Sequence, residues 1–265
     1  GLRAFVVDWD SIPGAANWQR SQRPVNWAFL PIKYRVEDRV RQASDLLYAI
    51  NEYIRRHLEG RGYKHVERLR LAVDPSVFHG GTIGNYLLYV GRLHPVKGID
   101  VLLQSFAGLA GEFPELSLVL AGDGPDEARL RSLASRLGVN EKVRFMGPVK
   151  DETVLAELYS HCTAFVLPSH FESFGIVVLE AMASSKPVVA SDIPGPQDIV
   201  SHERTGILTP PGDARSLTTV LSRLLVDESR QRRLGENARR EVEAHYTFPA
   251  MADTLLKTYH DYRGT

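Results

Sequence analysis

From residue 85 onward, short apolar runs alternate with helical patterns, and this feature constrains the fold of the 265-residue chain most. Each run is rich in Val, Leu and Phe, and the segment after it carries apolar residues at helical spacing. The predicted strands are 85–91, 116–122, 142–147, 164–168 and 187–191, and the helices between them are 98–113, 126–137, 152–161 and 175–184. Strands joined by helices pair in parallel and are buried on both faces, so the sequence predicts an α/β domain.

The two ends of the chain depart from this alternation. After 205–213 the pattern is helical, with helices predicted at 214–226, 227–244 and 248–262. The N-terminal part predicts a strand at 4–8, a charged helix at 33–43, a strand at 45–50, a helix at 51–59 and a strand within 65–73. These pieces are too few for a complete doubly wound sheet, and the Gly-rich 78–85 separates them from the alternation. We therefore expect a partial N-terminal domain at 1–78, a complete domain at 79–245, and a C-terminal helix at 246–265 that packs back toward the N-terminal domain.

Charge and cysteine content exclude several partners and compartments. Lys and Arg together number 32, as do Asp and Glu, so no net positive field attracts nucleic acid. The one cysteine, Cys162, lies in an apolar run, which excludes a disulfide framework and favours a reducing, cytoplasmic location. No apolar stretch approaches the roughly 20 residues that span a bilayer.

Two cations follow the first strand of the alternation. Ligands of a parallel α/β sheet bind beyond the carboxyl ends of its strands. Arg92 lies directly after strand 85–91, and Lys97 opens the next helix. Such a pair, beside the free amides of a helix N-terminus, suits a diphosphate group. Taken alone, it also fits a solvated surface loop, so the residues leave both interpretations open.

A glycine-rich turn, AGDGP at 121–125, follows the second strand. It resembles a dinucleotide-binding fingerprint, but Glu127 stands where the third glycine would be. The turn is therefore either a plain connection or a point, at Gly122, where the backbone closely approaches a ligand.

Polar residues also follow the buried run CTAFVL, in the segment PSHFESFGIVVLEAMA. Pro168 ends the strand, and Glu172 and Ser173 lie in the loop before a helix that begins near Gly175, so that its dipole and amides point outward. Glu180 lies inside this helix among apolar residues, where a carboxylate is costly unless it is paired. We therefore expect a partner for Glu180.

Together these segments resemble glycosyltransferase family 4, whose members have the GT-B fold of two facing Rossmann-like domains. The resemblance covers about 73–262 and rests on YVGRLHPVKGID, LVLAGDGP, VRFMGPV, VLPSHFESFGIVVLEAMA, PVVASDIPGPQDIV and GILTPPGD, in the family's order. It implies a complete C-terminal nucleotide-sugar-binding domain preceded by part of an acceptor-side domain. The implied activity is retaining transfer of a hexose from a nucleotide-diphosphate sugar, of UDP or GDP type, to a glycan or lipid-linked acceptor, as in cell-envelope polysaccharide biosynthesis.

The resemblance also implies roles for individual residues. Arg92 and Lys97 would neutralise the donor diphosphate and, with Glu172 at the donor sugar hydroxyls, form the catalytic set. Glu180 would accept hydrogen bonds from the ribose hydroxyls. The remaining expected contacts are the amides of Ser173, Phe174, Gly175 and Ile176 with sugar and phosphate, and Gly122, Pro148 and Val149 beside the base. Members of this type use no bound metal and no cofactor, since the cations and the helix dipole replace Mg²⁺.

Two departures from the family affect the N-terminal part. A further stretch of the first domain normally precedes the strand at 4–8, so we expect a fragment that binds nucleotide sugar, transfers it slowly or not at all, and self-associates through an incomplete sheet. The family also places a His just after this strand, whereas Trp9 and Asp10 stand here, either replacing it or packing in the loop. Residues 33–70 hold ten Lys or Arg against six Asp or Glu, which fits a solvated helical face or a peripheral contact with a membrane.

Two other functions stay open. A nucleotide-sugar epimerase can share this fold, and it would need catalytic carboxylates in the cleft and no acceptor. A non-catalytic nucleotide-sugar-binding module, or a subunit completed by a partner chain, would fit the incomplete N-terminal part.

Overall fold

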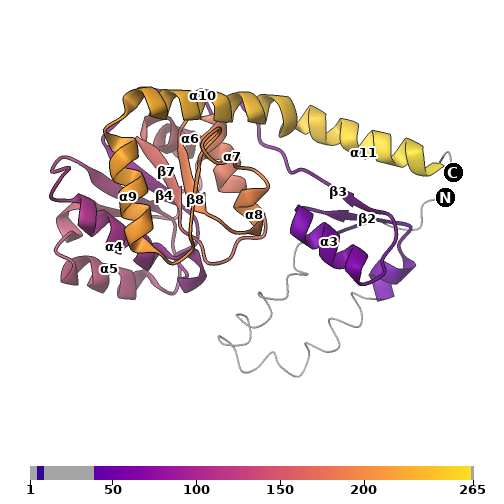
Figure 1. The fold of residues 1–265 in the computed structure, drawn as a ribbon, viewed down its shortest axis with the longest axis horizontal. Coiled ribbons are helices and arrows are strands. Elements are labelled where there is room, and N and C mark those ends of the chain that lie inside the picture. Colours follow the sequence, from indigo (N-terminus) through magenta and orange to yellow (C-terminus); the bar gives the residue numbers. More distant parts are fainter. Residues whose placement is uncertain (1–4, 9–38, 264–265) are drawn as a thin grey trace, which may run out of the picture. The chain divides into compact units, whose positions relative to one another are not determined.

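The computed structural model describes residues 5–8 and 39–263 and divides the chain into two compact units. Unit 1 consists of Gly1–Leu71 and Met251–Thr265, and unit 2 of Ala72–Ala250. The chain passes between the units twice (Figure 1). The units are defined by contacts between residues, which do not test where domains begin and end. The domain boundaries expected at 78/79 and 245/246 therefore stay predictions.

Unit 2 contains a doubly wound sheet of six parallel strands. In chain order they are β4 (Tyr86–Val90), β5 (Ser117–Ala121), β6 (Val143–Gly147), β7 (Ala164–Leu167), β8 (Val188–Ser191) and β9 (Ile207–Thr209). Their order in the sheet is β6-β5-β4-β7-β8-β9. The chain thus winds outward from β4 in one direction, returns, and winds outward from β7 in the other. Strand order therefore reverses between β4 and β7, which pair through Leu87–Ala164 and Leu88–Phe165.

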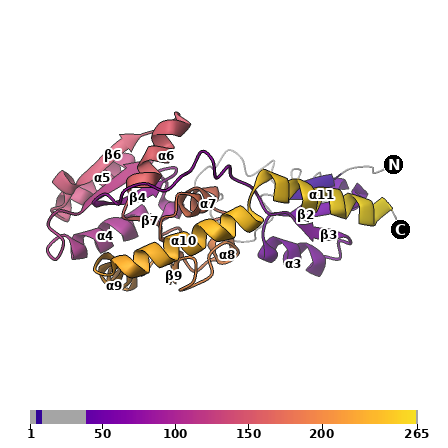
Figure 2. The same cartoon turned by 90° about the horizontal axis from the view of Figure 1, so that it is seen from above.

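Helices cover both faces of this sheet (Figures 1 and 2). They are α4 (Ile99–Leu109), α5 (Glu127–Arg136), α6 (Glu152–His161), α7 (Ile176–Ala183), α8 (Pro194–Gln197), α9 (Ala214–Leu225) and α10 (Glu228–His245). Helix α4 packs beside α9, and α7 beside α10. Asp151, Asp213 and Asp227 cap α6, α9 and α10, each accepting a hydrogen bond from a backbone amide of the first turn.

The core of unit 2 explains why its strands read as unbroken apolar runs. All residues of β7 and β8 are buried, as are Leu87, Leu88 and Tyr89 of β4. A parallel sheet with helices on both faces leaves no side of its strands in water. The predicted α/β class and parallel sheet are therefore confirmed.

Unit 1 contains a three-stranded parallel sheet in the order β1 (Phe5–Asp8), β2 (Leu46–Ala49) and β3 (Val66–Arg68). Helix α3 (Glu52–Gly60) joins β2 to β3, and the side chain of Asn51 caps it. Helix α11 (Phe248–Arg263) places two side chains on the sheet. The resulting apolar cluster consists of Leu46, Tyr48, Leu69, Met251 and Leu255.

Most predicted elements recur within one or two residues, and the differences have local causes. The predicted helix 98–113 corresponds to α4, which begins at Ile99 but ends at Leu109, and an unpredicted 3-10 turn, η2 (Pro95–Lys97), precedes it. The sequence did not predict β9, which has only three residues, or α8, which contains two prolines. Residues 39–43 are helical, whereas 33–38, Trp9 and Asp10 lie outside the described residues.

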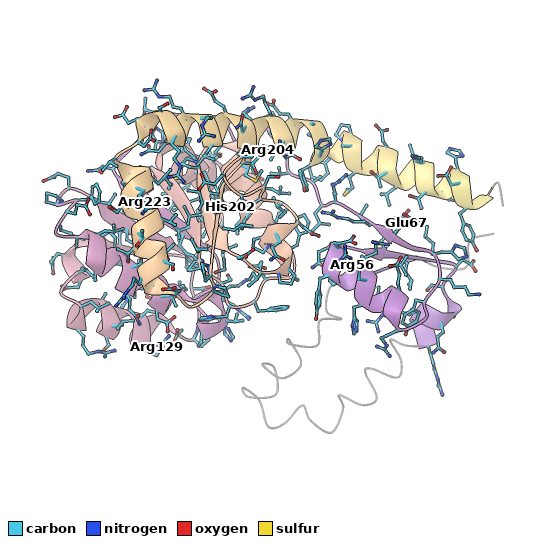
Figure 3. The ribbon with its side chains drawn as sticks, in the orientation of Figure 1. Arg56, Glu67, Arg129, His202, Arg204 and Arg223 are labelled. Atoms are coloured by element: carbon cyan, nitrogen blue, oxygen red, sulfur yellow. The ribbon has the colours of Figure 1, made fainter. Side chains whose placement is uncertain are left out.

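Arg239 on α10 ties three segments of unit 2 together. Its Nη1 donates to the carbonyl oxygens of Ala183, at 2.6 Å, and Phe78, at 3.1 Å. Its Nη2 donates to the carbonyl of Pro75 at 3.2 Å. Other arginines of this unit, such as Arg129 on α5 and Arg223 on α9, are exposed (Figure 3). Arg239 therefore joins α10, the end of α7 and the first segment of unit 2.

Arg239→Ala should lower the free energy of unfolding of unit 2 by roughly 2–4 kcal/mol, because partly buried carbonyls lose charge-assisted hydrogen bonds. Urea denaturation measures this, and protection of the buried Cys162 thiol from alkylation gives a second measure. The matched control is Arg240→Ala, since Arg240 is exposed on the same helix. Equal stabilities of the two variants would contradict a structural role for Arg239.

Candidate functional site

The reversal of strand order brings two loops together at the carboxyl edge of the unit 2 sheet. One loop, 91–98, follows β4, and the other, 168–175, follows β7. The amide of His170 donates to the carbonyl of Val96 at 2.8 Å. Gly98 has a φ of 61°, and a Cβ there would lie 2.1 Å from the carbonyl oxygen of Pro168. Open α/β sheets bind ligands in the crevice at such a reversal, so the two loops form the candidate site.

A lysine–glutamate ion pair joins these two loops. Lys97, the last residue of η2, places Nζ 2.6 Å from Oε2 of Glu172. The side chains are only 21% and 12% exposed, so the pair is largely removed from water. Removing one partner would leave the other charge poorly solvated. The structure thus brings together two of the residues that the sequence singled out.

Arg92 adds a second cation to the loop after β4. Its side chain is exposed, and no carboxylate of the described residues lies within ion-pair distance. Its carbonyl accepts a hydrogen bond from the hydroxyl of buried Tyr89 at 3.0 Å. Burial, and then the charge of Glu172, raise the pKa of Tyr89, so the hydroxyl stays protonated and donates. Burial and the neighbouring Arg92 charge lower the pKa of His94 in the same loop, so positive charge here comes from Arg92 and Lys97.

The glycine turn after β5 lies at the same edge of the sheet. The amide of Gly122 donates to the carbonyl of Gly147 at 2.8 Å, which joins the ends of β5 and β6. Pro148 is exposed and Val149 partly exposed directly after β6. No described contact links Pro148 or Val149 to the Lys97–Glu172 pair.

The loop after β7 ends at the N-terminus of α7. Gly175 precedes the helix with a φ of 96°, and the first helical residue, Ile176, is 39% exposed. The first amides of a helix have no acceptor within it, so they are available to an anion. Phe174 is buried and anchors the loop, whereas Ser173 is partly exposed.

Glu180 on α7 has a protein partner that the sequence did not identify. The hydroxyl of Tyr159 on α6 donates to Glu180 Oε2 at 2.7 Å. Burial raises the pKa of Glu180, the tyrosine hydrogen bond opposes this, and the charge of Glu152 adds to it. Tyr159 lies in the last turn of the helix that precedes the apolar strand, and nothing in the sequence distinguishes it from an ordinary core residue. Only the packing of α6 against α7 reveals its contact.

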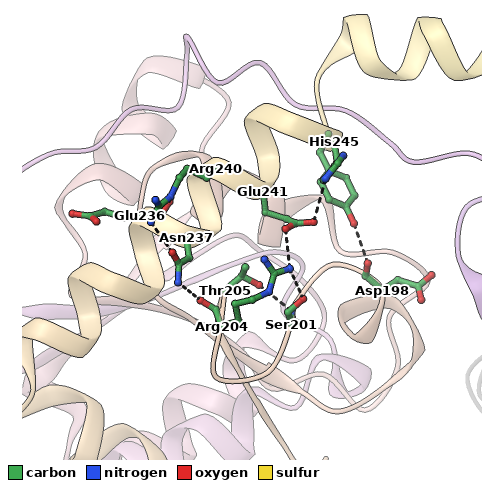
Figure 4. Close-up of polar contacts among 10 residues, drawn as sticks. Asp198, Ser201, Arg204, Thr205, Glu236, Asn237, Arg240, Glu241 and His245 are labelled. Carbon is green, nitrogen blue, oxygen red and sulfur yellow. Dashed lines mark hydrogen bonds and ion pairs between the residues drawn. The ribbon is translucent and has the colours of Figure 1, made fainter.

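A cavity of about 340 Å³ lies elsewhere in unit 2, beside α10, and Figure 4 shows the polar contacts among the residues that line it. Its lining residues are Arg204, Asn237, Arg240 and Glu241. Arg204 already pairs with Glu241 at 2.9 Å, and Arg240 donates to Asn237 Oδ1 at 2.7 Å. The loop carrying Arg204 directly precedes β9, so the cavity lies near the amino ends of the strands and not at the candidate site.

The described residues form neither a metal-binding cluster nor a membrane-spanning helix. Within 5–8 and 39–263, no group of three His, Cys, Asp or Glu side chains is arranged to hold a metal ion. None of the helices in these ranges is both long and apolar enough to cross a bilayer.

Comparison with known families identifies the family of this chain. A profile described as glycosyl transferases group 1 matches residues 82–241. The chain belongs to this family. The match lies wholly within unit 2 and includes both loops of the candidate site.

Relatives of the chain include several named transferases. An exopolysaccharide phosphotransferase of Streptomyces coelicolor is 36% identical over 83% of this chain and 23% of that protein. An uncharacterized glycosyltransferase of Methanocaldococcus jannaschii is 36% identical over 65% of this chain and 44% of that protein. A D-inositol 3-phosphate glycosyltransferase of Catenulispora acidiphila is 39% identical over 67% of this chain and 44% of that protein. The chain thus spans less than half the length of each of these relatives.

Solved structures confirm the predicted GT-B fold. Sucrose-phosphate synthase from Thermosynechococcus elongatus gives a TM-score of 0.83 at 26% identity, over 98% of this chain and 68% of that one. The Anabaena protein HepE, in complex with UDP and glucose, gives 0.75 at 21% identity, over 83% of this chain and 64% of that one.

Gly195→Ala should lower the free energy of unfolding by about 1–3 kcal/mol, because overpacking forces backbone to shift. A Cβ at Gly195, on α8, would lie 2.7 Å from the carbonyl oxygen of Glu172 and 2.9 Å from that of Phe174. Urea denaturation measures the change. Gly111→Ala is the control, since a Cβ there meets nothing within 4 Å and its stability should not fall. A Gly195→Ala variant as stable as wild type would show that the close packing of α8 against the loop of Glu172 does not exclude a side chain at residue 195.

Proposed function

We propose that the chain binds a nucleotide-diphosphate sugar at the reversal between β4 and β7. We further propose that the whole protein transfers the sugar, a hexose, with retention to a glycan or lipid-linked acceptor. The observation that carries the proposal is the Lys97–Glu172 pair, which joins the two loops where a doubly wound sheet binds its ligand. Family membership and the UDP and glucose bound by HepE support it.

The two loops supply complementary groups for the donor. Arg92 and Lys97 bind the diphosphate through charge-assisted hydrogen bonds. A phosphate oxygen near Lys97 Nζ competes with Glu172 for this cation. Glu172 is then able to accept hydrogen bonds from the hydroxyls of the donor sugar. The ion pair of the free chain therefore holds both groups in place before the donor arrives.

The remaining predicted residues surround the rest of the donor. Amides of Ser173, Phe174, Gly175 and Ile176 contact sugar and phosphate at the N-terminus of α7. Glu180 accepts hydrogen bonds from the ribose hydroxyls. Gly122, Pro148 and Val149 flank the base, which is of the UDP or GDP type.

The proposed chemistry needs no protein nucleophile. The bond between the anomeric carbon and the diphosphate oxygen breaks, and Arg92, Lys97 and the α7 dipole stabilise the charge that develops on phosphate. The acceptor oxygen forms its bond on the face that the phosphate leaves, and a phosphate oxygen takes the acceptor proton. Configuration at the anomeric carbon is thereby retained. No metal ion takes part, because the two cations neutralise the diphosphate.

The acceptor is assigned to the whole protein and not to this chain. Retaining transfer requires the acceptor within about 3–3.5 Å of the anomeric carbon. An alpha-D-kanosaminyltransferase and a D-inositol 3-phosphate glycosyltransferase, whose names differ in sugar or acceptor, match this chain over less than half of their own length. A cytoplasmic location beside the membrane, as in cell-envelope polysaccharide synthesis, fits a lipid-linked acceptor.

Lys97→Ala should weaken binding of UDP or GDP by about 1.5–3 kcal/mol, the range for charge-assisted hydrogen bonds, and leave binding of uridine or guanosine almost unchanged. Calorimetry measures both. Lys142→Ala is the control, because Lys142 donates to the carbonyl of Ala110 at 3.1 Å near the start of β6. Equal losses for diphosphate and nucleoside would place the diphosphate elsewhere.

Binding of the nucleotide by this chain, and sugar transfer by the full gene product, should both persist in excess chelator. The Arg92 and Lys97 side chains replace a metal ion in neutralising phosphate. Calorimetry follows binding, and NMR of the product gives the anomeric configuration. Transfer that stops in chelator and returns with Mg²⁺ or Mn²⁺ would overturn the metal-independent mechanism, and an inverted product would overturn retention.

A further inference from the structure

Tyr159 lies in a buried aromatic cluster between α6 and α7. The residue is fully buried, and its hydroxyl donates to Glu180 Oε2 at 2.7 Å. Its ring contacts the ring of Phe165 on β7, with centroids 5.5 Å apart. The ring of Phe78 meets it edge-on, with centroids 5.8 Å apart and an interplanar angle of 79°. The tyrosine is therefore held on several sides, and its hydroxyl has little freedom to move.

The same surroundings hold α7 in place. Arg239 donates both to the carbonyl of Phe78 and to that of Ala183, the last residue of α7. The guanidinium of Arg239 thus binds both Phe78, whose ring packs on Tyr159, and the helix that carries Glu180. This arrangement links the packing around Tyr159 to the position of the helix that carries Glu180.

The carboxylate of Glu180 has two oxygens, and Tyr159 occupies only one of them. Oε2 accepts the tyrosine hydrogen bond, whereas Oε1 has no hydrogen-bond donor among the described protein groups. An ionised carboxylate accepts about four hydrogen bonds over its two oxygens. Glu180 therefore retains the capacity to accept from two adjacent hydroxyls of a ligand.

We propose that Tyr159 is a positioning residue for the ribose site, whose hydroxyl orients the Glu180 carboxylate toward the two ribose hydroxyls. This inference rests on the proposed contact between Glu180 and ribose. Tyr159 itself touches no ligand, because it is fully buried.

The charged and titratable groups around Glu180 define the expected pH dependence. Burial and the charge of Glu152, on α6, raise the pKa of Glu180, and the Tyr159 hydrogen bond lowers it. Burial and the charge of Glu180 raise the pKa of Tyr159 well above its usual value, with smaller contributions from Cys162 and Tyr89, so its hydroxyl remains a donor. Without the hydroxyl, the pKa of Glu180 rises further. The carboxylate form is lost as pH falls through this pKa, so a variant without the hydroxyl loses it at a higher pH.

The test compares UDP and GDP with their 2′,3′-dideoxy analogues across a pH series, by calorimetry on the wild-type chain and two variants. Tyr159→Phe should reduce the preference for the ribonucleotide about 2- to 10-fold near neutral pH, the equivalent of one hydrogen bond. The pH below which the preference disappears should rise. Binding of the dideoxy analogue should not change. Phe78→Leu is the control, since it alters the packing of the ring but keeps the hydroxyl, and its pH profile should match wild type.

Glu180→Gln separates this inference from the proposed function. If it weakens ribonucleotide and dideoxy analogue equally, Glu180 does not bind ribose and the proposed contact is wrong. If it removes the preference while Tyr159→Phe keeps the wild-type preference and pH profile, the contact stands and the role of Tyr159 is overturned.

A second substitution covers the case in which Tyr159→Phe does not fold. Replacing Tyr159 by 3-fluorotyrosine keeps the hydroxyl and the ring, and the fluorine makes the hydroxyl a stronger hydrogen-bond donor. The pKa of Glu180 should then fall, and the preference for ribonucleotide should extend to lower pH. An unchanged pH profile in this variant would also overturn the inference.

Discussion

The parallel pairing of β4 with β7 is the constraint on which the candidate site depends. The paired residues of these two strands, Leu87 with Ala164 and Leu88 with Phe165, are 77 positions apart in the chain. Because strand order reverses between them, the loops that follow leave the sheet side by side, and Lys97 meets Glu172. Neither loop alone can form this ion pair. Each charged side chain loses contact with solvent, and the opposite charge on the other loop offsets the cost of that loss.

The two carboxylates of the β7–α7 segment are stabilised in different ways. Glu172 is paired with a cation across the crevice, whereas Glu180 accepts a hydrogen bond from a neutral phenol beneath it. A partner that carries charge responds strongly to an incoming phosphate, and a buried hydroxyl does not. In the proposed function, Glu172 therefore exchanges its partner when the donor binds, whereas Glu180 keeps its orientation throughout.

The two compact units differ in the size of their sheets and in their share of the family match. Unit 2 holds all six strands of a doubly wound sheet and the whole of the family match. Unit 1 has three described strands, and helix α11 supplies Met251 and Leu255 to its apolar cluster. Binding of the nucleotide sugar is accordingly proposed for unit 2, and the choice of acceptor for the whole protein.

The sequence by itself determined the α/β class and the elements of unit 2, because apolar periodicity and turn residues act locally. It missed β9, α8 and the 3-10 turn at Pro95–Lys97, whose few residues carry too weak a local pattern, and it extended α4 four residues beyond its end at Leu109. It also singled out Lys97, Glu172 and Glu180 as site residues. Only the tertiary structure decided their partners: the Lys97–Glu172 pair depends on strand order, and the Tyr159 hydrogen bond depends on packing between two helices. Contacts between residues distant in the chain arise from how elements pack, and no local pattern encodes them.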